Sequence, residues 1–222
     1  MKLDTYLGDW VNYINKKELN AILNILGKEY SIKAIEPSQV NVFKAFNLCQ
    51  YKDMKVLFLG MDPYPQRGVA TGILFGNNSD KSLSPSLQVL KECVIDYTSP
   101  FNNIIFDHSL ESWSKQGILM LNSALTVETN KIGSHVMLWR PFISSLLQNI
   151  STSNSGIVFV LFGEQAQTFT PYINTVTNHV INVKHPSYYA RIGQKMPREW
   201  FIELNRILKN LYNENIKWFI KY

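Results

Sequence analysis

The chain has 222 residues, of which 45% are hydrophobic, so it is long enough to bury one sizeable core. Its formal net charge of +5 favours a polyanionic partner. Cys49 and Cys93 match neither a disulfide framework nor a zinc site, and the apolar runs are too short to span a bilayer. We therefore expect an unsecreted protein without membrane association, folded as a single domain over residues 1–222.

Four short apolar runs predict the strands of one sheet, at residues 55–59, 117–121, 157–161 and 180–183. Each run is almost continuously apolar, which is typical of a strand covered on both faces of a parallel sheet. Helical patterns occur at residues 17–28, 39–46, 85–95, 141–150, 165–173 and 197–211, with Ser84 as a cap and Pro197 as a first helical residue. The sequence predicts an α/β fold with a central four-stranded parallel sheet flanked by helices on both faces.

Polar residues or glycines follow each predicted strand. Asp62 comes after the first strand, Asn122 after the second, Gly163 after the third and His185 after the fourth. The carboxyl ends of parallel strands meet at one edge of a sheet, where ligands bind. A carboxylate, an amide, a glycine turn and an imidazole are therefore expected to converge in an active site.

Several motifs occur in the order and spacing of family 1 uracil-DNA glycosylases. GMDPYP at 60–65 stands where the family's water-activating loop reads GQDPYH, and its final proline is similar to poxvirus members. The other matches are ATGILF at 70–75, SPSL at 84–87, WSKQGIL at 113–119, LNSALTV at 121–127, SH at 134–135, FGEQAQ at 162–167 and HPS at 185–187. This resemblance implies a base-excision repair enzyme that flips uracil out of DNA, hydrolyses its N-glycosidic bond and leaves an abasic site, with no metal or cofactor.

The resemblance assigns the chemistry to Asp62 and His185. Cleavage of the N-glycosidic bond gives the sugar cationic character, while the base leaves with negative charge. Asp62 would orient the attacking water and stabilise the sugar, and His185 would act as a neutral donor to the uracil O2. Without the resemblance, Asp62 is also compatible with an ordinary turn and His185 with a structural role.

Uracil binding is assigned by the same resemblance to four residues. Asn122 would pair with the O4 and N3–H edge of uracil, which cytosine would mismatch. Phe75 would stack on the base, Tyr64 would exclude the methyl group of thymine, and the backbone of Met61 would contact the base. Asn122 alone is also compatible with a turn, and Phe75 with a core residue.

DNA contacts are expected in the surrounding loops. Hydroxyl and main-chain N–H groups there would hold phosphates, and a wedge residue in the place of the family's leucine would fill the gap left by the flipped nucleotide. The wedge residue is Tyr189, whose aromatic ring could stack on neighbouring bases. The expected DNA-binding residues are Pro65, Ser84, Pro85, Ser86, Gly163, Ser187 and Tyr189.

The sequence also departs from the family. Met61 replaces a glutamine, Pro65 replaces a histidine and lacks an N–H donor, and Glu164 adds a negative charge near the expected phosphate path. Tyr188 and Tyr189 replace the usual Pro-Leu, and an Arg-Gly-Phe stretch is absent from 190–197. We expect these changes to affect DNA affinity and wedge behaviour more than the chemistry.

Three other functions compete with this interpretation. A scaffold that only holds DNA has no physical need for the whole set of catalytic and uracil-binding residues. A thymine-mismatch glycosylase usually has asparagine and a smaller residue in the places of Asp62 and Tyr64. A two-metal nuclease would need an acidic cluster, which the sequence does not contain.

The expected partner is uracil-containing single- or double-stranded DNA. A protein inhibitor or a replication partner is a further option, and the protein is expected to be a monomer. If the protein is of bacterial or viral origin, we expect it in the cytoplasm. If it comes from a eukaryotic virus, we expect it in the nucleus or in a viral factory.

Overall fold

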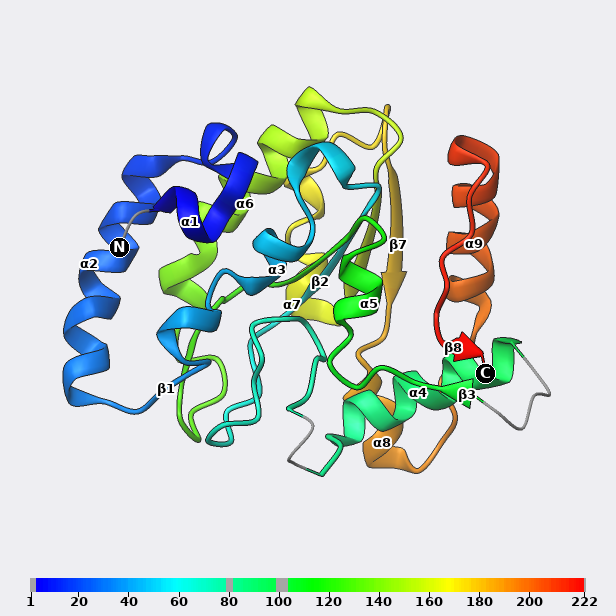
Figure 1. Ribbon diagram of the computed structural model, residues 1–222, viewed down its shortest axis with the longest axis horizontal. Helices are drawn as coiled ribbons and strands as arrows, with labels where there is room; N and C mark the ends of the chain where they lie inside the picture. Colours follow the sequence, from blue (N-terminus) through cyan, green and yellow to red (C-terminus); the bar gives the residue numbers. More distant parts are fainter. Residues whose placement is uncertain (1–2, 79–81, 99–103, 222) are drawn as a thin grey trace.

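The computed structural model describes residues 3–78, 82–98 and 104–221. Its centre is a four-stranded parallel sheet with the strand order β4-β2-β6-β7 (Figure 1). The strands are β2 (Val56–Gly60), β4 (Ile118–Asn122), β6 (Val158–Phe162) and β7 (His179–Val183). The expected sheet is confirmed, and each strand begins within one residue of its predicted start.

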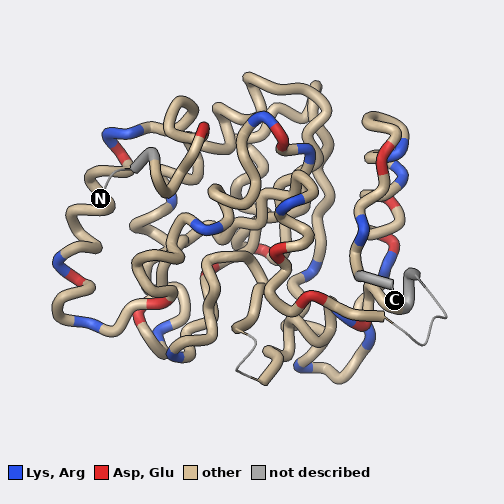
Figure 2. Tube along the Cα trace, in the orientation of Figure 1, with Lys and Arg blue, Asp and Glu red and all other residues tan. Residues whose placement is uncertain are grey.

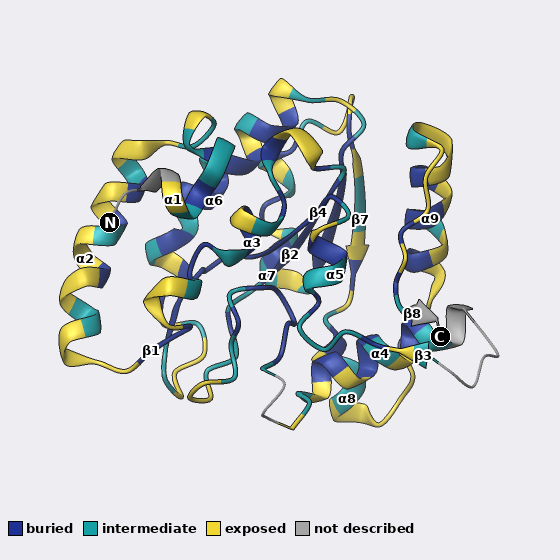
Figure 3. Cartoon of the chain, viewed as in Figure 1, coloured by how far each residue is buried: buried dark blue, intermediate teal, exposed yellow. Residues whose placement is uncertain are grey.

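Burial on both faces explains the apolar sequence of three of the four strands. Every residue of β2, β4 and β6 is buried, which Figure 3 shows as a dark blue centre. In β7 only Val183 is buried, while His179 and Asn182 are exposed. The expectation of complete burial was wrong for β7, an edge strand that contacts chiefly β6 and α9 (Glu199–Tyr212). The other edge strand, β4, is buried because α3 (Lys44–Leu48) and α5 (Glu111–Ser114) both contact it.

Alternate residues of the strands pack on opposite faces, as the period of a β-strand requires. Leu57, Leu119 and Phe159 belong to one apolar cluster, and Val56, Ile118 and Val158 to the other. Residues from α1 (Leu3–Leu7), α2 (Lys16–Ile32), α3 (Lys44–Leu48), α6 (Val136–Ser153) and α7 (Glu164–Gln167) join the first cluster. Residues from α4 (Pro85–Thr98), α5 (Glu111–Ser114) and α9 (Glu199–Tyr212) join the second, while α8 (Pro186–Ile192) packs against α4. Helices therefore cover both faces, as expected.

The remaining elements are short. The 3-10 helices are η1 (Gly8–Asn12), η2 (Gln39–Asn41), η3 (Tyr51–Asp53) and η4 (Thr170–Tyr172). Two antiparallel strand pairs join β1 (Ile35–Glu36) to β5 (Val127–Glu128) and β3 (Ile104–Ile105) to β8 (Ile220–Lys221). None of these strand pairs was predicted.

Several predicted helix limits were wrong. The helix expected to start at Pro141 begins five residues earlier, because Val136 and Trp139 are already buried in the core. Pro197 does not open the last helix, which begins at Glu199 after Arg198. The helix expected at 165–173 is divided into α7 and η4, and the one expected at 39–46 into η2 and α3.

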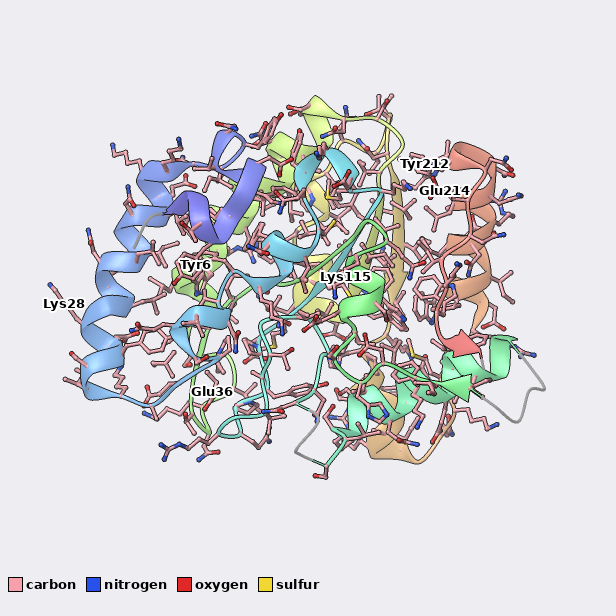
Figure 4. All side chains as sticks on the ribbon, viewed as in Figure 1. Tyr6, Lys28, Glu36, Lys115, Tyr212 and Glu214 are labelled. Carbon is pink, nitrogen blue, oxygen red and sulfur yellow. The ribbon has the colours of Figure 1, made fainter. Side chains whose placement is uncertain are left out.

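Charged residues lie along the outer surface rather than in one block (Figure 2). At the amino end of β2, Lys55 forms an ion pair with Glu214 and lies 5.8 Å from the ring centroid of Tyr212. Figure 4 labels Tyr212 and Glu214 where α9 ends, so this contact ties the C-terminal segment to the sheet. In the described part of the chain, no helix is long and apolar enough to cross a membrane.

Candidate active site

A cavity of about 870 Å³ lies at the carboxyl ends of the strands. Asn122 is the last residue of β4, Asp62 lies two residues after β2, Gly163 directly follows β6, and His185 lies two residues after β7. All four line the cavity, and the strand order places them across the whole width of the sheet. The structure therefore brings together the four residues that follow the predicted strands.

A backbone N–H from a distant loop holds the carboxylate of Asp62. Gly133 donates to Asp62 Oδ2 over 2.6 Å. Burial raises the pKa of Asp62, and the hydrogen bond from Gly133 opposes that rise. Gly133 has φ of +78°, and a Cβ there would lie 3.2 Å from Met61 Cε, so glycine permits the close approach. Sequence reasoning missed Gly133, and its one signal was a glycine directly before the SH motif.

The hydrogen bonds of His185 define its neutral form. Ser187 N–H donates to His185 Nδ1 over 3.2 Å, and Ser187 Oγ lies 2.8 Å from the same nitrogen. A backbone N–H only donates, so Nδ1 accepts and we assign the ring proton to Nε2. Burial lowers the pKa of His185 to about 4, so the imidazole is neutral near pH 7.

Asn122 presents an unused acceptor. Its side chain is buried, and its Oδ1 has no hydrogen-bond partner among the described residues. A buried amide oxygen without a donor is costly, and a ligand N–H would satisfy it. Gly60 makes room beside it, because a Cβ at Gly60 would lie 2.3 Å from Leu74 Cδ1 and 3.0 Å from Asn122 Oδ1.

Two aromatic residues form walls of the cavity. Phe75 is buried and has φ of +61°, an uncommon conformation for an aromatic residue. Its ring centroid lies 5.4 Å from that of His185 and 5.2 Å from that of Phe162. The Tyr64 hydroxyl donates to the carbonyl oxygen of Phe75 over 3.1 Å, and burial raises the pKa of Tyr64.

The expected DNA-binding residues divide into two groups. Pro65, Ser86, Gly163 and Ser187 line the cavity with Met61, whereas Ser84, Pro85 and Tyr189 do not. Gly163 has φ of +85°, and a Cβ there would lie 3.0 Å from His185 Cβ, so the turn requires glycine.

An aromatic residue flanked by cations lines the cavity next to Tyr189. Tyr188 lies in the cavity wall, whereas Tyr189 packs partly against the apolar cluster beside α4. Lys184 Nζ lies 4.7 Å from the Tyr188 ring centroid, and the Arg191 guanidinium lies 5.9 Å from it. Sequence reasoning did not assign Tyr188, Lys184 or Arg191 to the site, although the paired tyrosines were a visible departure.

Within residues 3–78, 82–98 and 104–221, no group of three or more His, Cys, Asp or Glu side chains is placed to hold a metal ion.

Solved structures share the fold of this chain. A mimivirus UNG in complex with UGI matches with a TM-score of 0.84 at 22% identity, covering 98% of this chain and 91% of that chain. The UNG of Nitratifractor salsuginis matches with a TM-score of 0.65 at 17% identity, covering 100% of this chain and 98% of that chain.

Protein relatives and a family model match the sequence itself. A uracil-DNA glycosylase of Fusobacterium nucleatum is 34% identical over 198 residues, covering 88% of this chain and 86% of the relative. A uracil-DNA glycosylase of Campylobacter jejuni is 36% identical over 209 residues, covering 92% and 85%. The model of the uracil DNA glycosylase superfamily matches residues 46–209. The resemblance found in the motifs is confirmed, and this chain belongs to the uracil DNA glycosylase superfamily.

Proposed function

We propose that this uracil-DNA glycosylase excises uracil with Asp62 and His185 as its catalytic residues. The observation that carries the proposal is the cavity in which a half-buried carboxylate, a neutral imidazole and an unpaired amide oxygen meet. The reaction requires stabilisation of a cationic sugar, stabilisation of an anionic base and recognition of the uracil edge, and these three groups match those requirements.

The proposed reaction breaks the bond between the sugar C1′ and the uracil N1. The bonding electron pair leaves with the base, and His185 Nε2–H donates a hydrogen bond to the O2 atom that gains negative charge. Asp62 faces the cationic sugar and orients a water molecule, whose oxygen forms the new bond to C1′. The water proton passes to the Asp62 carboxylate or to solvent, and an abasic site remains.

Base selection is assigned to the walls of the cavity. Asn122 Oδ1 would accept from N3–H of uracil, and its amide nitrogen would donate to O4. Cytosine has no N3–H and carries a donor at C4, so both pairings would fail. Phe75 would stack on the base, Tyr64 would lie beside C5, and the backbone of Met61 would contact the base.

The DNA strand would lie across the rim of the cavity. Pro65, Ser86, Gly163 and Ser187 line that rim and are proposed to contact phosphates. We propose that the protein acts as a monomer on single- or double-stranded DNA. The mimivirus complex with UGI supports a protein inhibitor as a further partner, and bacterial relatives support a cytoplasmic location.

One assay tests this function. The pure protein is incubated in EDTA with an end-labelled oligonucleotide that contains one uracil, and abasic sites are then cleaved with alkali. We expect cleavage only at the uracil and only after alkali. Cleavage before alkali would indicate a nuclease, and an intact strand after alkali would indicate a binding scaffold. The thymine oligonucleotide of the same sequence is the control.

A further inference from the structure

The phenol group of Tyr64 joins three segments of the chain at the cavity wall. Its oxygen lies 3.1 Å from the carbonyl oxygen of Phe75 and 2.5 Å from Ser84 Oγ. A carbonyl oxygen can only accept, so the single phenol proton points to Phe75. Ser84 must then donate its hydroxyl proton to the oxygen of Tyr64.

The same hydroxyl of Ser84 holds the beginning of α4. Leu87 N–H donates to Ser84 Oγ over 3.2 Å, and Gln88 N–H donates to the Ser84 carbonyl oxygen over 3.0 Å. This is the pattern of a helix N-cap. Ser86, two residues further on, is buried and lines the cavity. One side chain therefore links the start of α4 to the cavity wall.

The only hydroxyl proton of Ser84 is committed to Tyr64, inside the protein. Ser84 itself does not line the cavity, although the sequence predicted it to contact DNA. In this arrangement the Ser84 hydroxyl acts on the wall residue Tyr64. The order of proton donation runs from Leu87 N–H to Ser84, from Ser84 to Tyr64, and from Tyr64 to the Phe75 carbonyl.

We propose that Ser84 is a positioning residue for base selection, which fixes the Tyr64 ring beside C5 of the bound pyrimidine. The inference rests on the proposed function. An apolar wall rejects one extra methyl group only modestly, and less so if the ring can move aside. Two hydrogen bonds at the far end of the ring restrict that movement. Without these hydrogen bonds, the Tyr64 ring can move away from a C5 substituent, while uracil still fits.

The test compares excision of uracil and 5-bromouracil from otherwise identical oligonucleotides. Bromine is close in size to a methyl group, and comparing each variant with wild type on the same base cancels the difference in leaving groups. Ser84→Ala and Ser84→Gly should each lower the ratio of kcat/KM for uracil over 5-bromouracil roughly tenfold. Glycine is nearly as good an N-cap as serine, so Ser84→Gly separates the contact to Tyr64 from the stability of α4.

A double-mutant cycle with Tyr64→Phe tests whether Ser84 affects base selection through the Tyr64 oxygen. Tyr64→Phe keeps the ring but removes the oxygen that both hydrogen bonds share, so it should lower the ratio by itself. Ser84→Ala should then cause no further loss of selectivity in the Tyr64→Phe background. Ser86→Ala is the matched control from the same segment, and it should lower kcat/KM for both bases by the same factor.

The outcomes separate this inference from the proposed function. A wild-type protein that does not release uracil would overturn the function. An active wild type whose selectivity survives both Ser84→Ala and Ser84→Gly would overturn the inference alone. The inference would also fail if Ser84→Ala lowered selectivity equally with and without the Tyr64 oxygen, because Ser84 would then act by another route.

Discussion

Single backbone N–H groups orient the two side chains assigned to the chemistry. Gly133 donates to Asp62, and Ser187 donates to His185. Both side chains would act on charges that develop in the transition state, so their replacement should affect turnover more than DNA binding.

Asp62→Asn and His185→Ala should each lower the single-turnover rate of uracil excision by about 100-fold or more. Rapid-quench kinetics at saturating enzyme measures this rate, and fluorescence anisotropy measures DNA affinity separately. His179→Ala, which replaces the exposed first residue of β7, is the control and should excise uracil normally. Near wild-type excision by either variant would refute the role assigned to that residue.

The low pKa of His185 makes stability depend on pH. Its folded-state pKa is about 4, whereas an unfolded histidine titrates near 6.5. Between these values the unfolded state binds more protons, so the free energy of unfolding falls as pH falls from 6.5 to 4. Protonation of His185 in the unfolded state lowers the free energy of unfolding by about 3 kcal/mol at the lower end of this range. Urea unfolding of wild type and His185→Gln measures the free energy of unfolding across this pH range, and it should fall more steeply for wild type. The same pH dependence in both proteins would contradict a neutral ring in the folded state.

Replacement of Tyr64 and replacement of Asn122 should each admit a different wrong base to the cavity. Tyr64→Ala opens space beside C5 and should allow slow excision of thymine but not of cytosine. Asn122→Asp can present a protonated donor or accept from the exocyclic amine, and it should admit cytosine while thymine stays excluded.

Oligonucleotides with U, T or C at one position, given to both variants, provide the measurement. Both variants should excise uracil more slowly than wild type. Cytosine release by Tyr64→Ala, or thymine release by Asn122→Asp, would show that the walls of the pocket are assigned wrongly.

The sequence could predict site residues only where a pattern marked their position. Asp62, Asn122 and His185 were expected at one edge because each follows an apolar run, and they line one cavity. Gly133 lies 71 positions along the chain from Asp62, and no local pattern reports such a contact. The sequence marked Ser84 as a helix cap and a DNA-binding residue, but its local context does not reveal that its hydroxyl reaches Tyr64. The roles of all these residues stay predictions.

At the scale of elements, α7 places a negative charge at the cavity. Glu164 is its first residue, is exposed, and lines the rim. Glu164→Gln should tighten binding to a uracil-free oligonucleotide about twofold to fivefold at low salt, and the gain should disappear as salt screens the charge. Glu214→Gln removes a charge at the opposite, amino-terminal end of β2, beside Lys55. It is the control and should leave DNA affinity unchanged. Weaker binding by Glu164→Gln would mean that the phosphate path runs elsewhere.

Helix α8 offers two tyrosines for the proposed wedge. The family resemblance favours Tyr189, while Tyr188 lies in the cavity wall between Lys184 and Arg191. If the wedge is the residue at the cavity, Tyr188→Ala should slow excision from duplex DNA about tenfold more than from single strands, because only duplex requires extrusion of a paired base. Tyr189→Ala should then lower mainly the melting temperature. The reverse pattern would assign the wedge to Tyr189.

Elements with a strong period were predicted well and short ones were not. The inner strands and the long helices have continuous or periodic apolar residues, whereas β1, β3, β5 and β8 have two residues each. A two-residue strand exists only through its partner, as in the pairing of Ile35 with Glu128, so its own sequence has no period to detect. The sequence pattern marked Pro141 as the first residue of a helix, but α6 begins at Val136, because Val136 and Trp139 are buried in the core.

At the scale of the whole molecule, the α/β architecture follows from the alternation of apolar runs with helical patterns. Strand order could not be deduced in the same way. The sequence order β2, β4, β6, β7 becomes β4-β2-β6-β7 in space, with the first strand in the interior. Hydrophobic patterns mark each strand as buried but do not name its neighbours. The single-domain organisation stays a prediction.

The spatial order of the strands also determines when activity can arise during folding. Asn122 ends the edge strand β4, and His185 follows the other edge strand, β7, so in the described sheet β2 and β6 lie between the strands that place them. A partly folded chain that lacks β4 cannot place Asn122 at the cavity, and one that lacks β7 cannot place His185 there. Because such non-local pairings form slowly, recovery of excision after dilution from denaturant should lag behind the return of helical circular dichroism. The rate at which excision recovers would then measure the pairing of the edge strands with the rest of the sheet.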